Sequence, residues 1–346
     1  MKSANSLKIN CIGLGHWGPN LVRAIDSNRH AVIGTVCDIN PDRLAVVRQN
    51  IPTITNISTD ALATINDPEC GAIVIATPTE THLSLVRAAL EAGKHVFVEK
   101  PLSLNVNESV NLVNLAREKK LVLAVGHVFL FNKGVLAIRD LIASGEIGKI
   151  NYIFATRTNF GPVRTDCNAL WDLGSHDLSI INFWIGTNPV STTARGQAFL
   201  NPDIEDLVVA SYTYPGSILA CIHASWLNPS KVRQIMVVGQ KKMVIFDDMN
   251  LNAPVQIISK SMNQARFPEY VDSIGTFRMS IPQGEITIPQ IKGGEPVANQ
   301  MAHFIDCIFE QKKPINNADI AVDVVRQLAA AEESMKNQSI LTDIKY

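Results

Sequence analysis

Three segments of the chain carry residue types that could do chemistry. The first is the glycine-rich run Gly13-Leu14-Gly15-His16-Trp17-Gly18 near the start of the chain. The second is Glu99-Lys100-Pro101, and the third is Asp172-Leu173-Gly174-Ser175-His176. Glycine runs that open a helix bind phosphate groups, and Lys, Asp and His side chains can hold a hydroxyl group and move its proton. The three segments therefore predict a phosphorylated cofactor and proton transfer at a hydroxyl.

The glycine run follows a predicted strand over residues 8–14 and precedes a predicted helix over residues 19–27. Gly13, Gly15 and Gly18 fit the pattern G-x-G-x-x-G. The first glycine permits a tight turn, the second lets a pyrophosphate approach the backbone, and the third lets the helix pack on the strand. A glycine turn without a ligand is the alternative, and the position between a strand and a helix favours dinucleotide binding.

Asp38 ends the next predicted strand, 20 residues after Gly18. A carboxylate at this place accepts hydrogen bonds from the adenine ribose and repels a 2′-phosphate, so NAD is expected rather than NADP. Arg43 could soften that repulsion, although a solvated helix residue is the favoured interpretation. His16 and Trp17 are expected to contact the cofactor, and packing of Trp17 beneath the loop is the alternative.

Later strand ends complete the predicted cofactor site, because ligands bind at the carboxyl ends of parallel strands. For Lys100 an ordinary exposed turn lysine is equally compatible with the sequence. For His127 the alternative is a cap on the junction between two domains. The cofactor-binding residues expected at these strand ends are Thr77, Pro78, His82, Glu99, Lys100 and His127.

Asp172 and His176 are four positions apart, so they share one face if a helix begins here. Such a pair can hold a substrate hydroxyl and remove its proton, although an Asp–His pair at this spacing, considered alone, is more often structural. A metal site would need further ligands, and none lie nearby in the sequence, so no metal is predicted. Asp177 could equally be a helix-start residue that faces solvent.

Two regions must position these residues. Over residues 1–126, short apolar strands alternate with helices, which is typical of a doubly wound parallel sheet and predicts an NAD-binding Rossmann domain. Residues 127–346 favour half-buried strands between positions 151 and 246 and amphipathic helices over 296–310 and 318–336. This region predicts an α+β domain with an open, mostly antiparallel sheet that binds substrate and forms oligomers.

Composition excludes several classes of protein. An apolar fraction of 46% and a charged fraction of 18% exclude a disordered chain, and a net charge of −1 gives no global attraction to nucleic acid or anionic lipid. No apolar run reaches the ~18 residues of a membrane span, and the first residues lack the apolar core of a secretory signal. The 6 cysteines are scattered, without C-x-x-C, so a reduced cytoplasmic enzyme is expected.

In this order, the three segments resemble the Gfo/Idh/MocA family of sugar and polyol dehydrogenases. The resemblance extends to Glu295-Pro296 and the helix that follows. It implies that Lys100 contacts the nicotinamide ribose and the reacting hydroxyl, with Asp172 and His176 around the reacting carbon. The chain departs from the family pattern at Ser179, where an Asp is frequent. It departs again at Leu130, where an Arg is frequent, and this puts part of the substrate contacts in doubt.

Segments 159–172 and 226–233 resemble family members that act on nucleotide-linked amino sugars. They imply oxidation of the 3-hydroxyl of UDP-N-acetylglucosamine for lipid A or surface-polysaccharide synthesis, with a pathway aminotransferase consuming the keto product. Basic residues around the Asp172–His176 segment favour a diphosphate, and solvated loop charges are the alternative. The expected substrate-binding residues are Arg157, Asn159, Arg164, Asn168, Trp171, Asp172, His176, Lys231 and Arg233.

Two other functions stay open at this point. One is a free-sugar or inositol dehydrogenase of the same family. The other is a non-catalytic NAD-binding regulator, against which the intact Lys100, Asp172 and His176 argue. The strands between residues 151 and 246 carry apolar residues on alternate positions. A helix layer covers one face of such a sheet, so the other face is expected to form a homodimer or homotetramer.

Overall fold

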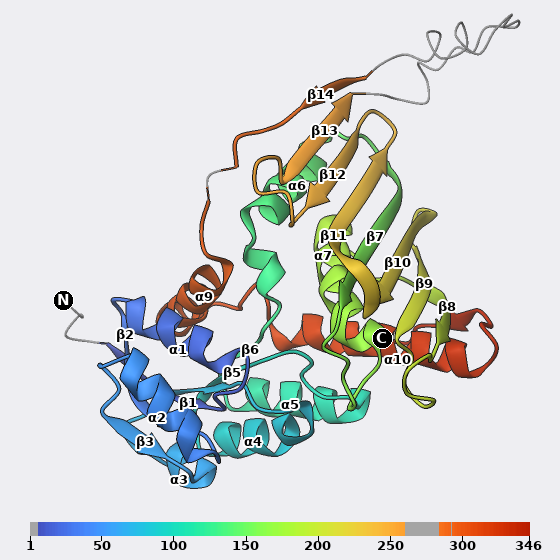
Figure 1. The fold of residues 1–346 in the computed structure, drawn as a ribbon. Helices are drawn as coiled ribbons and strands as arrows, with labels where there is room; N and C mark the ends of the chain where they lie inside the picture. The colour runs from blue at the N-terminus through green and yellow to red at the C-terminus, as the bar shows by residue number, and fades with distance from the viewer. Residues whose placement is uncertain (1–5, 260–283, 292) are drawn as a thin grey trace, which may run out of the picture. The chain divides into compact units, whose positions relative to one another are not determined.

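The chain folds into two compact units (Figure 1). The computed structural model describes residues 6–259, 284–291 and 293–346. The first unit comprises Met1–Asn132 and Gly294–Arg326, and the second comprises Lys133–Gly293 and Gln327–Tyr346. The units thus differ from the expected ranges 1–126 and 127–346 mainly because a late segment of the chain returns to the first unit. Among the described residues, no helix is long and apolar enough to cross a bilayer.

The first unit is built on a 6-stranded sheet in the order β3-β2-β1-β4-β5-β6. All its neighbouring strands pair in parallel. The strands are β1 (Leu7–Ile12), β2 (Ala31–Cys37), β3 (Asn56–Ser58), β4 (Ala72–Ile75), β5 (His95–Val98) and β6 (Leu123–Val125). The short apolar runs read from the sequence therefore form the predicted Rossmann sheet, to which the structure adds β3.

Helices cover both faces of this sheet (Figure 1), as its continuous apolar strands require. On one face α1, α2 and α9 share a core with β1, and on the other face α3, α4, α5 and the start of α10 share a core with β4. The helices of this unit are α1 (Gly18–Ser27), α2 (Pro41–Asn50), α3 (Ala61–Ile65), α4 (Thr79–Glu91), α5 (Val106–Glu118), the 3₁₀ turn η1 (Val128–Phe131) and α9 (Pro296–Glu310). Helix α10 (Ala318–Lys336) begins in the first unit and ends in the second.

Helix α9 was expected in the second domain, and its packing corrects that expectation. Met301 and Phe304 are fully buried in the same core as Ile9 and Leu21. The Phe304 ring meets the Phe97 ring of β5 edge to face, with 5.8 Å between centroids. An amphipathic pattern reveals that a helix has a buried face, but it does not reveal which sheet that face covers.

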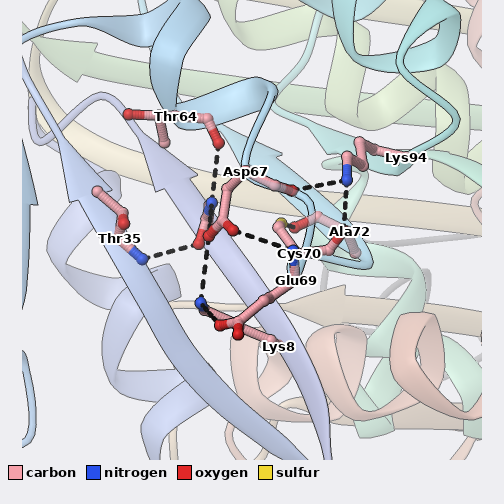
Figure 2. Close-up of polar contacts among 9 residues, drawn as sticks. Lys8, Thr35, Thr64, Asp67, Glu69, Cys70, Ala72 and Lys94 are labelled. Atoms are coloured by element: carbon pink, nitrogen blue, oxygen red, sulfur yellow. Dashed lines mark hydrogen bonds and ion pairs between the residues drawn. The ribbon is translucent and has the colours of Figure 1, made fainter.

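A polar cluster fixes β1 within the sheet (Figure 2). Asn10 is fully buried, and its Oδ1 accepts the Thr35 N–H at 2.7 Å where the pairing of β1 with β2 shifts register. Its Nδ2 lies 3.3 Å from Asp67 Oδ2, and the same carboxylate pairs with Lys8 at 3.2 Å. Lys94 Nζ donates to the carbonyl of Asp67 at 2.8 Å. The amide therefore satisfies a backbone group that the register shift would leave buried without a partner, and it steadies the strand that leads to the glycine loop.

The second unit is built on a 9-stranded sheet in the order β14-β13-β12-β11-β7-β10-β9-β8-β15. Strands β7 and β10 pair in parallel, and the other neighbours described pair antiparallel. The strands are β7 (Ile150–Phe160), β8 (Ser191–Gln197), β9 (Leu207–Tyr214), β10 (Ile218–Ser225), β11 (Leu227–Gly239), β12 (Met243–Asp247), β13 (Val255–Ser259), β14 (Glu285–Thr287) and β15 (Thr342–Asp343). The predicted open, mostly antiparallel sheet is confirmed.

Strand β7 shows how this sheet divides its two faces. Ile153 and Ala155 are fully buried, whereas Tyr152 and Phe154 are each 42% exposed. The register places Leu219 of β10 beside Tyr152, and Leu219 is 43% exposed. The helical segments described in this unit are α6 (Lys133–Ala143), the π-helical turn η2 (Leu170–Gly174), α7 (Ser175–Ile185) and the end of α10.

Candidate active site

The turn from β1 to α1 has the geometry of a phosphate-binding loop. Gly13 has a φ of +97°, and a Cβ there would lie 2.5 Å from the carbonyl oxygen of Ala76. A Cβ on Gly18 would lie 2.1 Å from the carbonyl oxygen of Gly13. In contrast, a Cβ on Gly15 would meet nothing within 4 Å. The loop therefore leaves no room for a side chain at Gly13 and Gly18, where it packs against the rest of its unit. At Gly15 there is free space, which fits the approach of a pyrophosphate.

Asp38 ties the end of β2 to this loop. It is 5% exposed, its Oδ2 accepts the Leu14 N–H at 2.6 Å and its Oδ1 accepts the Asn40 N–H at 2.8 Å. The Arg43 Nη1 lies 3.7 Å from Asp38 Oδ2 although the arginine side chain is 52% exposed. Arg43, favoured as a solvated helix residue, is thus both half-exposed and paired with the carboxylate.

His16 and Trp17 lie on the exposed side of the loop. Trp17 is 41% exposed, which does not support packing beneath the loop, and its ring meets the His16 ring edge to face at 6.1 Å. Thr77 lies on the packed side, because a Cβ on Gly13 would come within 2.8 Å of its methyl group. Pro78 is exposed and directly precedes α4. The structure therefore gathers these four residues around the glycine loop.

His82 holds two loops together. Its Nδ1 lies 2.8 Å from the carbonyl oxygen of Pro101, and its Nε2 lies 3.0 Å from that of Thr77. The side chain is buried, with 1% exposed. This arrangement supports a role in positioning the turn that carries Lys100, and it does not support the predicted contact of His82 with the cofactor.

Glu99, Lys100 and His127 cluster where β5 and β6 end. Burial raises the pKa of Glu99 to about 7, and the neighbouring Lys100 ammonium opposes this shift. A Cβ on Gly126 would lie 2.6 Å from Glu99 Oε2, so glycine leaves the room that this carboxyl occupies. Burial, with a smaller contribution from Lys100, lowers the pKa of His127 to about 4, so its imidazole is neutral at pH 7.

The buried ring of His127 fits a cofactor site. The side chain is 2% exposed, and within the described part of the chain neither ring nitrogen has a hydrogen-bond partner. Buried polar atoms in native proteins normally have partners. A bound group that hydrogen-bonds this imidazole beside Lys100 accounts for the two nitrogens, and the structure thereby fits the predicted nicotinamide end of the cofactor.

In the second unit, Asp172 lies in the π-helical turn η2 and His176 in the first turn of α7. The Asp172 Oδ1 lies 3.4 Å from Arg164 Nη1, and its Oδ2 accepts the Trp226 indole N–H at 3.2 Å. Arg164 also donates to Asp166 at 2.8 Å and is 32% exposed. Short π-helical turns occur at functional sites, and this one places a carboxylate that is held on both oxygens.

The Arg157 guanidinium is buried as well as paired, so a phosphate cannot reach it. Its Nε and Nη2 donate to Asp177 Oδ1 at 3.0 and 2.7 Å, and the two side chains are 3% and 1% exposed. The structure therefore does not support Arg157 as a substrate ligand. It also excludes the alternative that Asp177 faces solvent. The two residues form a buried pair that joins β7 to α7.

Asn168 and Trp171 are used within the fold. Asn168 Nδ2 donates to Glu205 at 3.0 Å and its Oδ1 accepts the Trp171 N–H at 3.2 Å. The Trp171 indole, 4% exposed, donates to Glu332 at 2.9 Å. These contacts support a structural role for both residues. They give no support to the predicted substrate contacts.

Three further predicted substrate residues lie on β7 and β11. Asn159 donates to the carbonyl of Gly161 through its side chain. Arg233 pairs with Asp248 at 3.1 Å, and Lys231 is exposed. Trp226, the partner of Asp172, is not among the residues predicted from the sequence. The hydrogen bond between Trp226 and Asp172 cannot be predicted from a local sequence pattern, because the two residues are far apart in the sequence.

Two family models match the chain. The model described as "Oxidoreductase family, NAD-binding Rossmann fold" covers residues 7–127, and the model described as "GFO/IDH/MocA C-terminal domain" covers residues 135–245. The chain belongs to the Gfo/Idh/MocA oxidoreductase family. The predicted enzyme class and cofactor are thereby confirmed: this family member is an oxidoreductase with an NAD-binding Rossmann domain.

Individual relatives of this Gfo/Idh/MocA protein act on different alcohols. It is 29% identical over 248 residues to the UDP-N-acetylglucosamine 3-dehydrogenase of Acidithiobacillus ferrooxidans, which covers 70% of this chain and 75% of the relative. It is 23% identical to the scyllo-inositol 2-dehydrogenase (NAD(+)) of Bacillus subtilis, over 96% of both chains. The solved structure of the Acidithiobacillus enzyme has a TM-score of 0.80 and 24% identity, covering 96% of this chain and 99% of that one, and it supports the fold.

The family cofactor fits the residues of the first unit. The glycine loop and Asp38 would hold its adenosine diphosphate part, and Lys100 and His127 would face its nicotinamide part. When bound, the dinucleotide supplies the hydride acceptor. Among the described residues, no group of three or more His, Cys, Asp or Glu could hold a metal ion, so the absence of a metal stays a prediction.

Proposed function

We propose that this enzyme oxidises a secondary hydroxyl, the 3-hydroxyl, of a nucleotide-linked amino sugar such as UDP-N-acetylglucosamine, with NAD as cofactor. The observation that carries the proposal is the Arg164–Asp172 pair, at 3.4 Å. It places a partly exposed guanidinium beside a segment suited to acid–base chemistry. Guanidinium groups bind phosphate oxygens in a bidentate manner. A relative of the same function that covers 70% of the chain supports the same substrate class.

The proposed roles of the side chains follow from their chemistry. His176 takes the proton of the reacting hydroxyl as a general base. Lys100 steadies the developing alkoxide and can relay that proton. Asp172, held by Arg164 and Trp226, orients the imidazole or the sugar. Because Arg164 and Trp226 already hold the Asp172 carboxylate, its orientation is set before the substrate binds.

An inositol or free-sugar dehydrogenase is the second candidate. The scyllo-inositol 2-dehydrogenase of Bacillus subtilis matches 96% of the chain, which is a longer match than that of the nucleotide-sugar enzyme. The buried pairing of Arg157 also removes one of the four cations that favoured a diphosphate. A non-catalytic regulator fits less well, because Lys100, Asp172 and His176 are all present.

Three properties accompany the proposed function. We propose a homodimer or homotetramer that buries the face carrying Tyr152 and Phe154, and a monomer in light scattering would contradict this.

The enzyme would act in the cytoplasm, in keeping with its six free cysteines. An aminotransferase would consume the keto sugar in the synthesis of lipid A or a surface polysaccharide.

One assay separates the candidates. Formation of NADH is followed over a panel of UDP-sugars, free hexosamines and inositols, with an aminotransferase and glutamate, its amino donor, present to remove the keto product. The proposal expects turnover with UDP-N-acetylglucosamine. Turnover with inositols alone would favour the second candidate. Uptake of NADH without turnover of any sugar would indicate a regulator.

A further inference from the structure

A cavity of about 620 Å³ lies in the first unit, away from the cofactor site. It is lined by His95 and Leu123, the first residues of β5 and β6. Glu99 and His127 follow the opposite ends of the same parallel strands. The cavity therefore opens at the far edge of the sheet, and its volume is typical of a small-molecule site. Neither the cofactor nor the proposed reaction uses it.

The wall of the cavity is apolar. Val113 and Ala116 of α5 are buried and form one side, and Leu123 and Ile308 contribute from β6 and α9. Beside them, His95 Nδ1 accepts the Val122 N–H at 2.9 Å. A neutral imidazole in this state carries its hydrogen on Nε2, so the ring adds a donor to an apolar surface.

The rim of the cavity is cationic. Arg117, Lys120, Lys312 and Lys313 are exposed lining residues, and they face a single lining carboxylate, Asp319. That carboxylate pairs with Arg117 and lies 2.7 Å from Lys313 Nζ. Lys312 pairs at 2.7 Å with a glutamate outside the lining. Among the described side chains, Lys120 has no ion-pair partner. The rim therefore keeps an excess of positive charge.

Helix dipoles explain only part of this arrangement. Basic residues near the ends of α5 and α9 stabilise those ends, but they do not require an apolar hollow beneath them. Two lining residues just beyond these helices, Lys120 and Gln311, have φ of 56° and 52°. Glycine is the usual residue at such left-handed positions. The chain instead keeps side chains there, at the rim.

We propose that this cavity binds an amphiphilic anion, a carboxylate or phosphate group on an aliphatic or aromatic body. The cationic rim suits the charged head group, and the apolar wall suits the body. A small inorganic anion would leave the wall exposed to water. An uncharged apolar molecule would leave the rim charges without a partner.

Calorimetric titration of the full chain, with NAD saturating so that the cofactor site is filled, tests this proposal. The probes are octyl phosphate and octanoate below their micellar concentrations. Inorganic phosphate represents the anionic head group alone, and 1-octanol represents the apolar body alone. At least one amphiphile is expected to bind ten times or more tighter than either half, and the stronger of the two identifies the head group. No binding of either amphiphile, or equal binding of inorganic phosphate, would overturn the proposal.

Variants at Lys120 locate the binding. Lys120→Glu should weaken binding of the amphiphile at least tenfold, and Lys120→Gly, which suits the left-handed backbone, should weaken it about threefold. The matched control is Lys119→Glu, the same change of charge one residue away and outside the lining. Equal binding by the two Lys120 variants and the wild type, or an equal loss in the Lys119 variant, would contradict binding in this cavity.

Discussion

Arg164 Nη1 lies 3.4 Å from Asp172 Oδ1, so a residue suited to phosphate binding is paired with a residue suited to orienting the reaction. The other oxygen of Asp172 accepts the Trp226 indole N–H at 3.2 Å. A bound diphosphate would compete for the guanidinium, while Trp226 would keep the carboxylate in place. Under the proposed function, the pair would connect recognition of the nucleotide to the geometry of the Asp172–His176 segment.

We expect Arg164→Ala to raise the KM for UDP-N-acetylglucosamine about 10- to 100-fold, because hydrogen bonds to charged groups are worth ~1.5–3 kcal/mol. The effect on kcat should be smaller, since Trp226 still holds Asp172. Inhibition by UDP should weaken in parallel. Arg139→Ala, which removes a partly exposed arginine over the Phe183 ring in the same unit, is the control. An unchanged KM in the Arg164 variant would remove this residue from substrate binding.

His176→Ala and Lys100→Ala should each lower kcat by ~10²–10⁴, the usual contribution of a general acid or base. Binding of NADH, measured by its fluorescence, should stay close to that of the wild type. His223→Ala, a half-buried histidine on β10, serves as the control for folding of the second unit. Either variant with near wild-type turnover would exclude that residue from the mechanism.

Asp38→Ser should narrow the preference for NAD over NADP, because the like charge facing a 2′-phosphate is removed. It should also raise the KM for both cofactors, because Asp38 Oδ2 accepts the Leu14 N–H of the glycine loop. Adding Arg43→Ala should return part of the preference if Arg43 then faces the 2′-phosphate. Steady-state kinetics with both cofactors decides this, and equal use of NAD and NADP by the wild type would contradict the assignment of Asp38.

Glu99→Gln should stabilise the protein at pH 8 and change little near pH 5. The folded protein holds the pKa of Glu99 at about 7, above the usual value of 4.5, so the folded state retains a proton that the unfolded chain loses. The contribution of protonated Glu99 to the free energy of unfolding of the wild type is therefore lost as the pH rises from about 4.5 to 7. The glutamine avoids that loss, worth about 1–3 kcal/mol above pH 7.

Denaturant unfolding between pH 5 and 8.5 measures this difference. Glu118→Gln, on the exposed surface of α5, is the control and should show no such pH dependence. A stability difference between Glu99→Gln and the wild type that is the same at pH 5 and pH 8 would contradict a buried carboxyl with a raised pKa.

The first unit could largely be predicted from the sequence because its signals are local. The glycine spacing, Asp38 at a strand end and the apolar run of β4 each fit within a few residues. The sequence gives no clear signal for strand β8, because STTARGQ is mostly polar and offers no alternation of apolar residues. Helix α9 was predicted in the wrong unit, because its packing against β1 and β5 depends on contacts between residues that are far apart in the sequence.

The candidate residues of the second unit were harder to predict for the same reason. From their charge, Arg157 and Arg164 were both predicted to bind substrate. In the structure, Arg157 is buried against Asp177, and Arg164 is partly exposed beside Asp172. Only the packing of α7 on β7 distinguishes the two arginines. The contact of Trp226 likewise appears only when the junction of β10 and β11 brings it to the π-helical turn.

The most direct test of the proposed function compares UDP-N-acetylglucosamine with free N-acetylglucosamine as substrates for NAD reduction by the wild-type enzyme. NADH is measured by absorbance, while an aminotransferase and glutamate convert the keto product into an amino sugar, which is identified by mass. The account predicts a kcat/KM for the UDP sugar at least 100-fold above that of the free sugar, with inhibition by UDP. Equal rates with the two sugars, or turnover only with inositols, would contradict it.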